Sequence, residues 1–142
     1  MKTLGRHLVA EFYDCDAVRL DDVRVIERSM RAAADAVGAT IVGDLYHRYE
    51  PQGVTGTVLI AESHMSVHTW PESGYAAIDI FTCGGLDPRP GFEVLMKGLG
   101  ARSCRVQELV RGLADDVDVA HPITPDDVLI VSRVAPLIMA RE

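Results

Sequence analysis

The chain has 142 residues, of which 48% are hydrophobic and 25% charged, a balance typical of one soluble globular domain. No apolar run approaches the roughly 18 residues of a membrane span, and a net charge of −7 without a basic stripe argues against a nucleic-acid partner. The three cysteines are an odd number and no signal peptide precedes them, which argues against a secreted disulfide framework and predicts a reduced, cytoplasmic protein.

The first half of the chain combines strand patterns with one clear helix pattern. Apolar residues recur at steps of three and four between Asp21 and Val37, and Gly38 follows as a natural helix end. The expected elements of this half are a strand at Leu4–Tyr13, a helix at Asp21–Val37, a strand at Thr40–Tyr49 and a turn marked by Pro51, Gly53 and Gly56.

The second half is mainly extended, with one short helix. Asp87 followed by Pro88 predicts an N-cap and a first helical turn, and Phe92, Leu95 and Leu99 then fall on one face. The expected elements of this half are an extended segment at Thr57–Trp70, a strand at Tyr75–Cys83, the helix after Pro88 and a strand at Ser103–Val110.

This order of elements predicts an α+β fold. Because short turns join some of the strands, we expect a two-layer sandwich with a mainly antiparallel sheet and two helices on one face. Residues 1–112 form the predicted domain, and residues 113–142 form a C-terminal extension of uncertain structure. In this extension Thr124–Asp127 resembles a helix start, Val128–Val131 reads equally as a strand, and Pro136 interrupts either. We expect the extension to pack on the domain or on a partner subunit.

Most groups with chemical potential lie between Glu62 and Gly84. A hairpin loop at Pro71–Gly74 would pair Trp70 with Tyr75 and fix the register of both strands. One face of the hairpin is then mainly polar, with the pairs His68 and Ala77, Ser66 and Asp79, His64 and Phe81, and Glu62 and Cys83. The other face is apolar and carries Met65 and Val67 against Ile78 and Ile80. In an unbroken strand Ser63 would point away from His68 and Cys83, so the register predicts a bulge or break near Ser63.

The residues alone leave several chemistries open. His64 and His68 have the spacing of a zinc pair on a helix, but on a strand they lie about 13 Å apart, so no metal site is expected. The sequence around Ser63 is not the nucleophile elbow of a serine hydrolase. Cys83 with a histidine remains a candidate thiol nucleophile, although a buried small cysteine and a structural histidine are the ordinary roles of such residues.

The sequence resembles the bacterial and archaeal S-adenosylmethionine decarboxylases over roughly residues 1–112. The resemblance is carried by LGRHLVAEFYDC, by HRYEPQGVTG and above all by ESHMSVHTWPESGYAAIDIFTCG. It implies a proenzyme that cuts itself between Glu62 and Ser63 and converts Ser63 into a pyruvoyl cofactor. That group forms a Schiff base with the substrate amine and accepts electrons that no ordinary side chain can hold.

The resemblance also implies roles for other residues. His68 is similar to the histidine that assists processing, Cys83 to the acid that protonates the substrate carbon, and Thr55 stands where the family usually has a serine that aids processing. Tyr49 is expected to stack on adenine and Glu72 to bind the ribose hydroxyls. Trp70 is expected to line the same substrate site, and two cleaved protomers are expected to pair with the sites at their interface.

Three functions are compatible with this reading. The first is decarboxylation of S-adenosylmethionine, which supplies the aminopropyl donor for spermidine. The second keeps the pyruvoyl chemistry with arginine or ornithine as substrate, although the aromatic Tyr49 favours a nucleoside. The third is an uncleaved, non-enzymatic dimer that binds a small molecule, and retention of Ser63, His68 and Cys83 together argues against it.

Overall fold

The computed structural model describes residues 3–113 and 136–140, which form one sheet with helices on one side. The strands are β1 Thr3–Tyr13, β2 Thr40–Arg48, β3 Val54–Ala61, β4 Ser63–Trp70, β5 Tyr75–Cys83, β6 Ser103–Leu113 and β7 Pro136–Ala140. The helices are α1 Ala17–Leu20, α2 Val23–Val37 and α3 Arg89–Gly98, and a 3-10 turn spans Pro71–Ser73.

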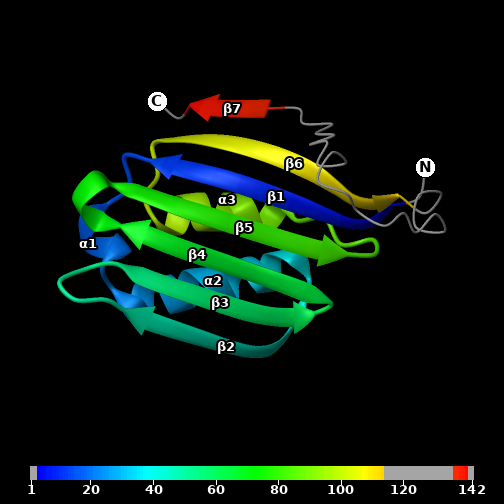
Figure 1. The fold of residues 1–142 in the computed structure, drawn as a ribbon, viewed down its shortest axis with the longest axis horizontal. Coiled ribbons are helices and arrows are strands. Elements are labelled where there is room, and N and C mark those ends of the chain that lie inside the picture. The colour runs from blue at the N-terminus through cyan, green and yellow to red at the C-terminus, as the bar shows by residue number, and fades with distance from the viewer. Residues whose placement is uncertain (1–2, 114–135, 141–142) are drawn as a thin grey trace, which may run out of the picture.

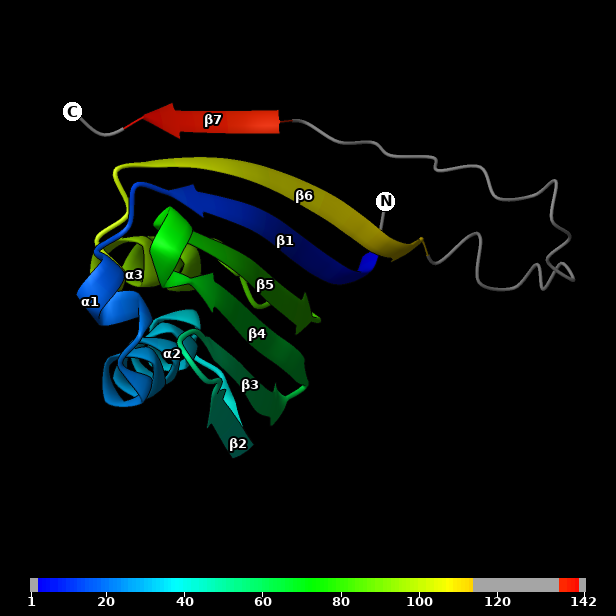
Figure 2. The same ribbon diagram turned by 60° about the vertical axis from the view of Figure 1, so that its left-hand side comes forward.

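The sheet is antiparallel throughout, and its seven strands lie in the order β2-β3-β4-β5-β1-β6-β7. The helices lie behind the sheet in Figure 1, and the turned view shows that they all cover the same face (Figure 2). The predicted α+β sandwich is therefore confirmed. Among the described residues no helix is long and apolar enough to cross a membrane.

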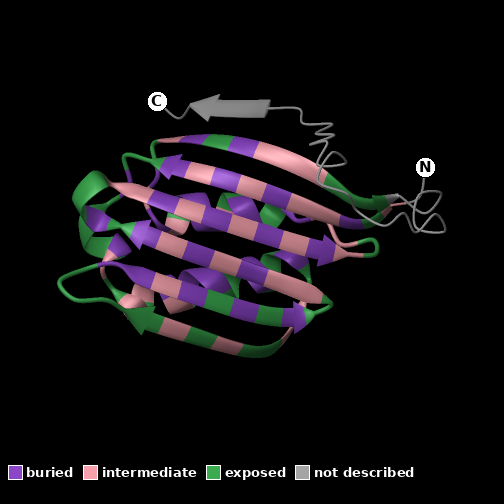
Figure 3. Ribbon diagram, in the orientation of Figure 1, coloured by how far each residue is buried: buried purple, intermediate pink, exposed green. Residues whose placement is uncertain are grey.

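The core lies between the sheet and the helices. Along each central strand, buried residues alternate with more exposed ones (Figure 3), because successive side chains point to opposite faces of a sheet. The inward side chains are large and apolar, and burying one such side chain stabilises the fold by roughly 1.5–3 kcal/mol. The fully buried members include Phe12, Ile26, Met30, Ile60, Met65, Ile78, Ile80, Leu95 and Met96.

Helix α2 begins and ends with strong capping signals. Asp22 accepts hydrogen bonds from the backbone N–H groups of Arg24 at 2.9 Å and Val25 at 3.3 Å. Gly38 ends the helix with φ 81°, a conformation that costs glycine little. The predicted helix therefore starts two residues later than its pattern suggested, because Asp22 serves as the cap.

Three local predictions were wrong. Thr57–Trp70 is not one extended segment but parts of β3 and β4, which reverse at Glu62. Gly56 lies within β3, not in a turn, and a β-carbon there would come within 2.5 Å of the Tyr46 ring. The N-cap of α3 is Pro88, whereas the Asp87 side chain accepts a hydrogen bond from the Arg89 backbone N–H at 3.0 Å.

The C-terminal extension contributes one described strand. β7 begins at Pro136 and pairs with the first residues of β6, so this proline starts an element. The alternatives at Thr124–Asp127 and Val128–Val131 lie outside the described residues. β6 itself runs to Leu113, and the division of the chain at residue 112 stays a prediction.

Candidate active site

The hairpin of β4 and β5 has the predicted register. Trp70 pairs with Tyr75, and Ser66 with Asp79 on the sheet face that no helix covers. Ser66 Oγ donates a hydrogen bond to Asp79 at 3.1 Å. The ladder ends at the pair of Ser63 and Thr82, so the predicted pairing of Glu62 with Cys83 is absent. Glu62 instead occupies the turn between β3 and β4.

The backbone at Ser63 is irregular, as the register predicted. Ser63 has φ 106°, in a region that favours glycine. Such a conformation in a residue with a β-carbon costs on the order of 1–3 kcal/mol and tends to occur at functional sites. The Glu62–Ser63 bond therefore lies at a strained point of the sheet, on a tight turn whose first residues are exposed.

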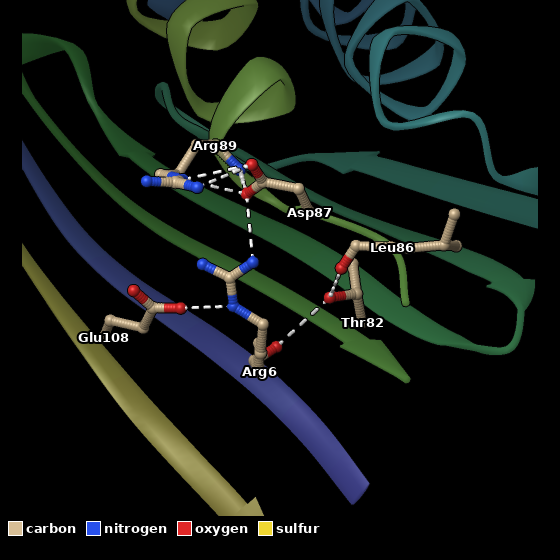
Figure 4. A network of polar contacts seen from close by, with 6 residues as sticks. All are labelled: Arg6, Thr82, Leu86, Asp87, Arg89 and Glu108. Carbon is tan, nitrogen blue, oxygen red and sulfur yellow. Dashed lines mark hydrogen bonds and ion pairs between the residues drawn. The ribbon is translucent and has the colours of Figure 1, made fainter. Parts of the chain in front are cut away.

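The end of β5 that pairs with Ser63 is anchored by contacts on the helix side of the sheet. Thr82 is only 1% exposed, and its hydroxyl donates to the Leu86 carbonyl at 2.9 Å. The loop after β5 is fixed by Arg6, which forms an ion pair with Asp87 at 3.3 Å and another with Glu108 (Figure 4). This network holds the end of β5 in place beside the strained bond.

Asp87 is also the ion-pair partner of Arg89. Hydrogen bonds from Arg89 lower the pKa of the Asp87 carboxyl, with a smaller contribution from the charge of Arg6. The network drawn in Figure 4 therefore keeps a carboxylate charged at the start of α3.

Cys83 is the partly exposed cysteine of the three, and it ends β5 next to Thr82. Cys15 is different, because burial, with a smaller contribution from Asp14, raises the pKa of its thiol to about 12. A thiol with so high a pKa is inert at neutral pH, so Cys83 is the better candidate for chemistry.

A second cluster lies at the opposite end of β4. Thr55 pairs with His68 in the sheet, and a hydrogen bond joins Thr55 Oγ1 to His68 Nδ1 at 3.0 Å. Both residues line a cavity of about 350 Å³. Its lining consists of Tyr49, Gln52, Thr55, His68, Thr69, Trp70 and Glu72. The cavity thus brings together five residues singled out from the sequence.

Aromatic surface in this cavity remains open to a ligand. Tyr49 is 47% exposed and Trp70 is 42% exposed, so each ring keeps surface on which a ligand can stack. The Trp70 ring lies 6.5 Å from the ring of His68 and 5.1 Å from the ring of Tyr75. Gln52 was not anticipated, although its place three residues after Tyr49 in the same turn is a signal that points to it.

The loop that carries Tyr49 is tied to the start of α2. Asp21 accepts a hydrogen bond from the Gly53 N–H at 2.9 Å and forms an ion pair with Arg48 at 2.9 Å. The hydrogen bond from Arg48 is the main reason why the pKa of Asp21 is lowered. Tyr49 N–H donates to the Gly53 carbonyl at 2.8 Å and closes the loop. The rim of the cavity is therefore preorganised.

The two clusters are far apart within one chain. Ser63 and His68 are five positions apart in β4, which corresponds to about 16 Å along a strand. No side chain bridges that distance. Ser63 and Cys83 lie at one end of the sheet, whereas Thr55, His68 and the cavity lie at the other.

Known proteins are similar to this chain in sequence and in fold. A family model described as S-adenosylmethionine decarboxylase matches residues 6–112. A Thermotoga petrophila protein named S-adenosylmethionine decarboxylase proenzyme is 54% identical over 129 residues, covering 87% of this chain and 99% of its own length. A Prochlorococcus marinus protein of the same name is 46% identical over 109 residues, covering 76% of this chain and 87% of its own length. The crystal structure of the adenosylmethionine decarboxylase from Aquifex aeolicus matches with a TM-score of 0.74 at 33% identity, covering 87% of this chain and 99% of that chain.

Proposed function

The chain belongs to the S-adenosylmethionine decarboxylase family, and on that premise we propose that it is a self-cleaving, pyruvoyl-dependent decarboxylase of S-adenosyl-L-methionine. The observation that carries the proposal is the strained backbone of Ser63, which follows an exposed turn and lies beside the end of the strand that carries Cys83. A binding protein has no need of a serine in this conformation. The uncleaved binding dimer is therefore not favoured.

The residues at the cut fit the chemistry of self-processing. Ser63 Oγ attacks the carbonyl carbon of Glu62, and the peptide nitrogen leaves that carbon, so the amide becomes an ester. Loss of the proton on the α-carbon of Ser63 then expels the Glu62 carboxylate. Hydrolysis of the resulting dehydroalanine releases ammonia and leaves a pyruvoyl group at position 63. Strain at Ser63 favours the first step because the amide bond that holds the strain is broken.

The pyruvoyl group supplies an electron sink for the electrons left when CO2 departs. The remaining roles fall to side chains of the chain. Cys83, partly exposed at the end of β5, is proposed to deliver a proton to the substrate carbon after CO2 is lost. His68, held by Thr55, is proposed to move the proton whose loss drives the elimination step.

We propose that a complete site forms between two copies of the chain. Within one protomer His68 lies about 16 Å from Ser63, too far to take a proton from it. A two-fold axis that lies in the interface, parallel to the open face and across the strands, would place the His68 end of one sheet over the Ser63 end of the other. The same face exposes Leu45 by 77% and Leu59 by 53%, which a partner sheet would cover.

The cavity suits S-adenosylmethionine better than a plain amino acid. Its two exposed aromatic rings, Tyr49 and Trp70, offer flat surfaces for an adenine ring, and their faces attract a sulfonium cation. Glu72 in the same wall can accept hydrogen bonds from ribose hydroxyls. Arginine and ornithine carry no ring that would use these surfaces.

The substrate assay tests the proposed function directly. Purified protein is expected to release CO2 from carboxyl-labelled S-adenosylmethionine at a rate at least ~100-fold above that from arginine or ornithine, because only the nucleoside uses the aromatic cavity. Equal or faster release from either amino acid would reject the substrate assignment but keep the pyruvoyl chemistry. No release of CO2 from any of the three substrates would reject the proposal that the protein is a decarboxylase.

A second prediction concerns the hydrogen bond between Thr55 and His68. Thr55→Val keeps the shape of the side chain but removes the hydroxyl, so self-cleavage is expected to slow by about 10-fold as His68 loses its partner. Thr55→Ser keeps the hydroxyl and is the matched control, with cleavage within about threefold of the wild type. Both rates are measured by following loss of the full-length chain on gels. A Thr55→Val chain that is cut at the wild-type rate would remove Thr55 from the processing machinery.

The proposed setting is the cytoplasm, and the proposed product is the aminopropyl donor for spermidine synthesis. Among the described residues, none of the three cysteines forms a disulfide, which suits a reducing compartment.

A further inference from the structure

Arg111 projects from β6 on the open face of the sheet, at the end that carries Ser63 and Cys83. Its guanidinium lies 5.1 Å from the centre of the Phe81 ring, and Nη1 is 3.0 Å from His7 Nδ1. Neither contact involves a carboxylate, and the side chain is exposed. The position of this cation is thus fixed by an aromatic ring and an imidazole.

The contact with His7 defines the protonation of that ring. A guanidinium only donates hydrogen bonds, so His7 Nδ1 accepts from Arg111 and carries no proton. The proton of the neutral ring is therefore on Nε2, which donates to Asp79 at 2.9 Å. Asp79 also accepts from Ser66, so its oxygens are engaged away from Arg111. The Asp79 carboxylate therefore does not form an ion pair with the arginine.

Three arginines of the sheet and of helix α2 are compensated by carboxylates. Arg6, Arg31 and Arg48 each form ion pairs with two carboxylates. Within residues 3–113 and 136–140, Arg111 forms no ion pair. A held guanidinium whose remaining N–H groups face an open surface is suited to bind an anion, and a carboxylate fits its fork geometry.

Arg111 lies one strand beyond β1 from Cys83, at the end of β5 beside the cut bond. Gly5 lies between Cys83 and Arg111 in the sheet, paired with both. A β-carbon at Gly5 would come within 2.5 Å of the Phe81 ring, so glycine is needed for that ring to lean over β1. Phe81 in turn pairs with His64, the residue after Ser63. With strands about 4.8 Å apart, the backbones of Cys83 and Arg111 lie about 10 Å apart across Gly5, and the arginine side chain reaches back over β1 to His7 and Phe81.

We propose that Arg111 binds the α-carboxylate of the substrate. The inference rests on the proposed function, in which the α-amine of S-adenosylmethionine is attached at position 63. The carboxylate is carried by the carbon next to that amine, the same carbon that Cys83 is proposed to protonate, so it lies at the end of the sheet where the guanidinium is held. Arg111 is thus a substrate-binding residue on the same protomer as Ser63 and Cys83.

This role has a kinetic signature. The carboxylate is present in the bound substrate but leaves as CO2, so the contact with Arg111 stabilises the ground state at least as much as the transition state. Removing the contact therefore raises KM without lowering kcat. It leaves the affinity for the decarboxylated product unchanged, because the product has no carboxylate.

The experiment compares Arg111→Met with Arg111→Lys and with Arg28→Met, which removes an exposed arginine from α2 on the helix side. Each variant is first checked for self-cleavage by mass spectrometry. KM and kcat for S-adenosylmethionine come from CO2 release, and the affinity for the decarboxylated product is measured by calorimetry. For Arg111→Met we expect KM to rise about 10-fold, kcat to stay within about twofold and product affinity to stay within about twofold. Arg111→Lys is expected to raise KM about threefold, and Arg28→Met to change nothing.

Two outcomes would overturn the inference. An unchanged KM would show that Arg111 does not contact the substrate, and an equal loss of affinity for substrate and product would show that it only supports the sheet. If Arg111→Met is not cut, the Arg111→Lys data decide, and a flat KM there counts against the proposal. The wild type is measured first, because a wild-type chain that is neither cut nor active would refute the proposed function itself.

Discussion

Replacing Ser63 with alanine is expected to leave a folded, full-length chain that releases no CO2 from S-adenosylmethionine. Alanine has no hydroxyl to attack the Glu62 carbonyl, and it retains the β-carbon, so the backbone conformation at φ 106° is no harder to reach than with serine. Decarboxylation should fall by at least ~10³-fold, because no other side chain supplies the electron sink. The wild type should give two fragments in intact mass spectrometry, the second beginning at position 63.

The matched control is Ser103→Ala, which removes a hydroxyl at the start of β6, far along the chain from the cut. It should be cut and active like the wild type. Persistent cutting of Ser63→Ala, or a wild-type fragment that begins elsewhere, would contradict the proposed chemistry. Circular dichroism of the uncut variant separates loss of chemistry from loss of fold.

The hairpin register followed from the sequence because both of its signals are local. Pro71–Gly74 has the residues of a tight loop, and the alternation of Met65 and Val67 with polar neighbours permits one register only. The same alternation exposed the conflict at Ser63, and the structure has a positive φ at that residue. A local pattern thus predicted where the backbone would be irregular.

The reversal between β3 and β4 was missed for an equally local reason. The turn at Ala61 and Glu62 contains no glycine, proline or asparagine, so the segment reads as one long strand. What specifies the turn is the pairing of β3 with both β2 and β4, a contact between residues that no short window contains. The short helix α1 was missed too, because its four residues are too few for a periodic pattern.

The candidate site likewise combines residues that local sequence motifs predict with residues whose surroundings depend on long-range strand pairing. Tyr49, Thr55 and His68 were named from motifs, and the structure adds that they line one cavity. Arg111 had no such signal, because its surroundings are set by the order β5-β1-β6. Phe81 and Arg111 come together only when three strands distant in sequence pair side by side.

Co-assembly of two inactive variants is expected to restore activity if each site is shared between protomers. A heterodimer of Ser63→Ala and His68→Ala chains has one site in which Ser63 comes from the second chain and His68 from the first, and that site is intact. The other site lacks both groups. Isolated through two different affinity tags, this heterodimer should show about half of the wild-type activity per dimer, while each variant alone is inactive or nearly so.

The geometry also predicts which pair fails to complement. Ser63 and Cys83 lie at the same end of one sheet, so a heterodimer of Ser63→Ala and Cys83→Ala chains has no site with both groups intact. Its activity should remain at background even though the Cys83→Ala chain is cut. If sites were formed within single protomers, neither heterodimer would recover activity, and the about 16 Å between Ser63 and His68 would have to close by a rearrangement of β4. A shared site is the arrangement that predicts both results: activity is restored when the Ser63→Ala chain is paired with the His68→Ala chain, and it is not restored when it is paired with the Cys83→Ala chain.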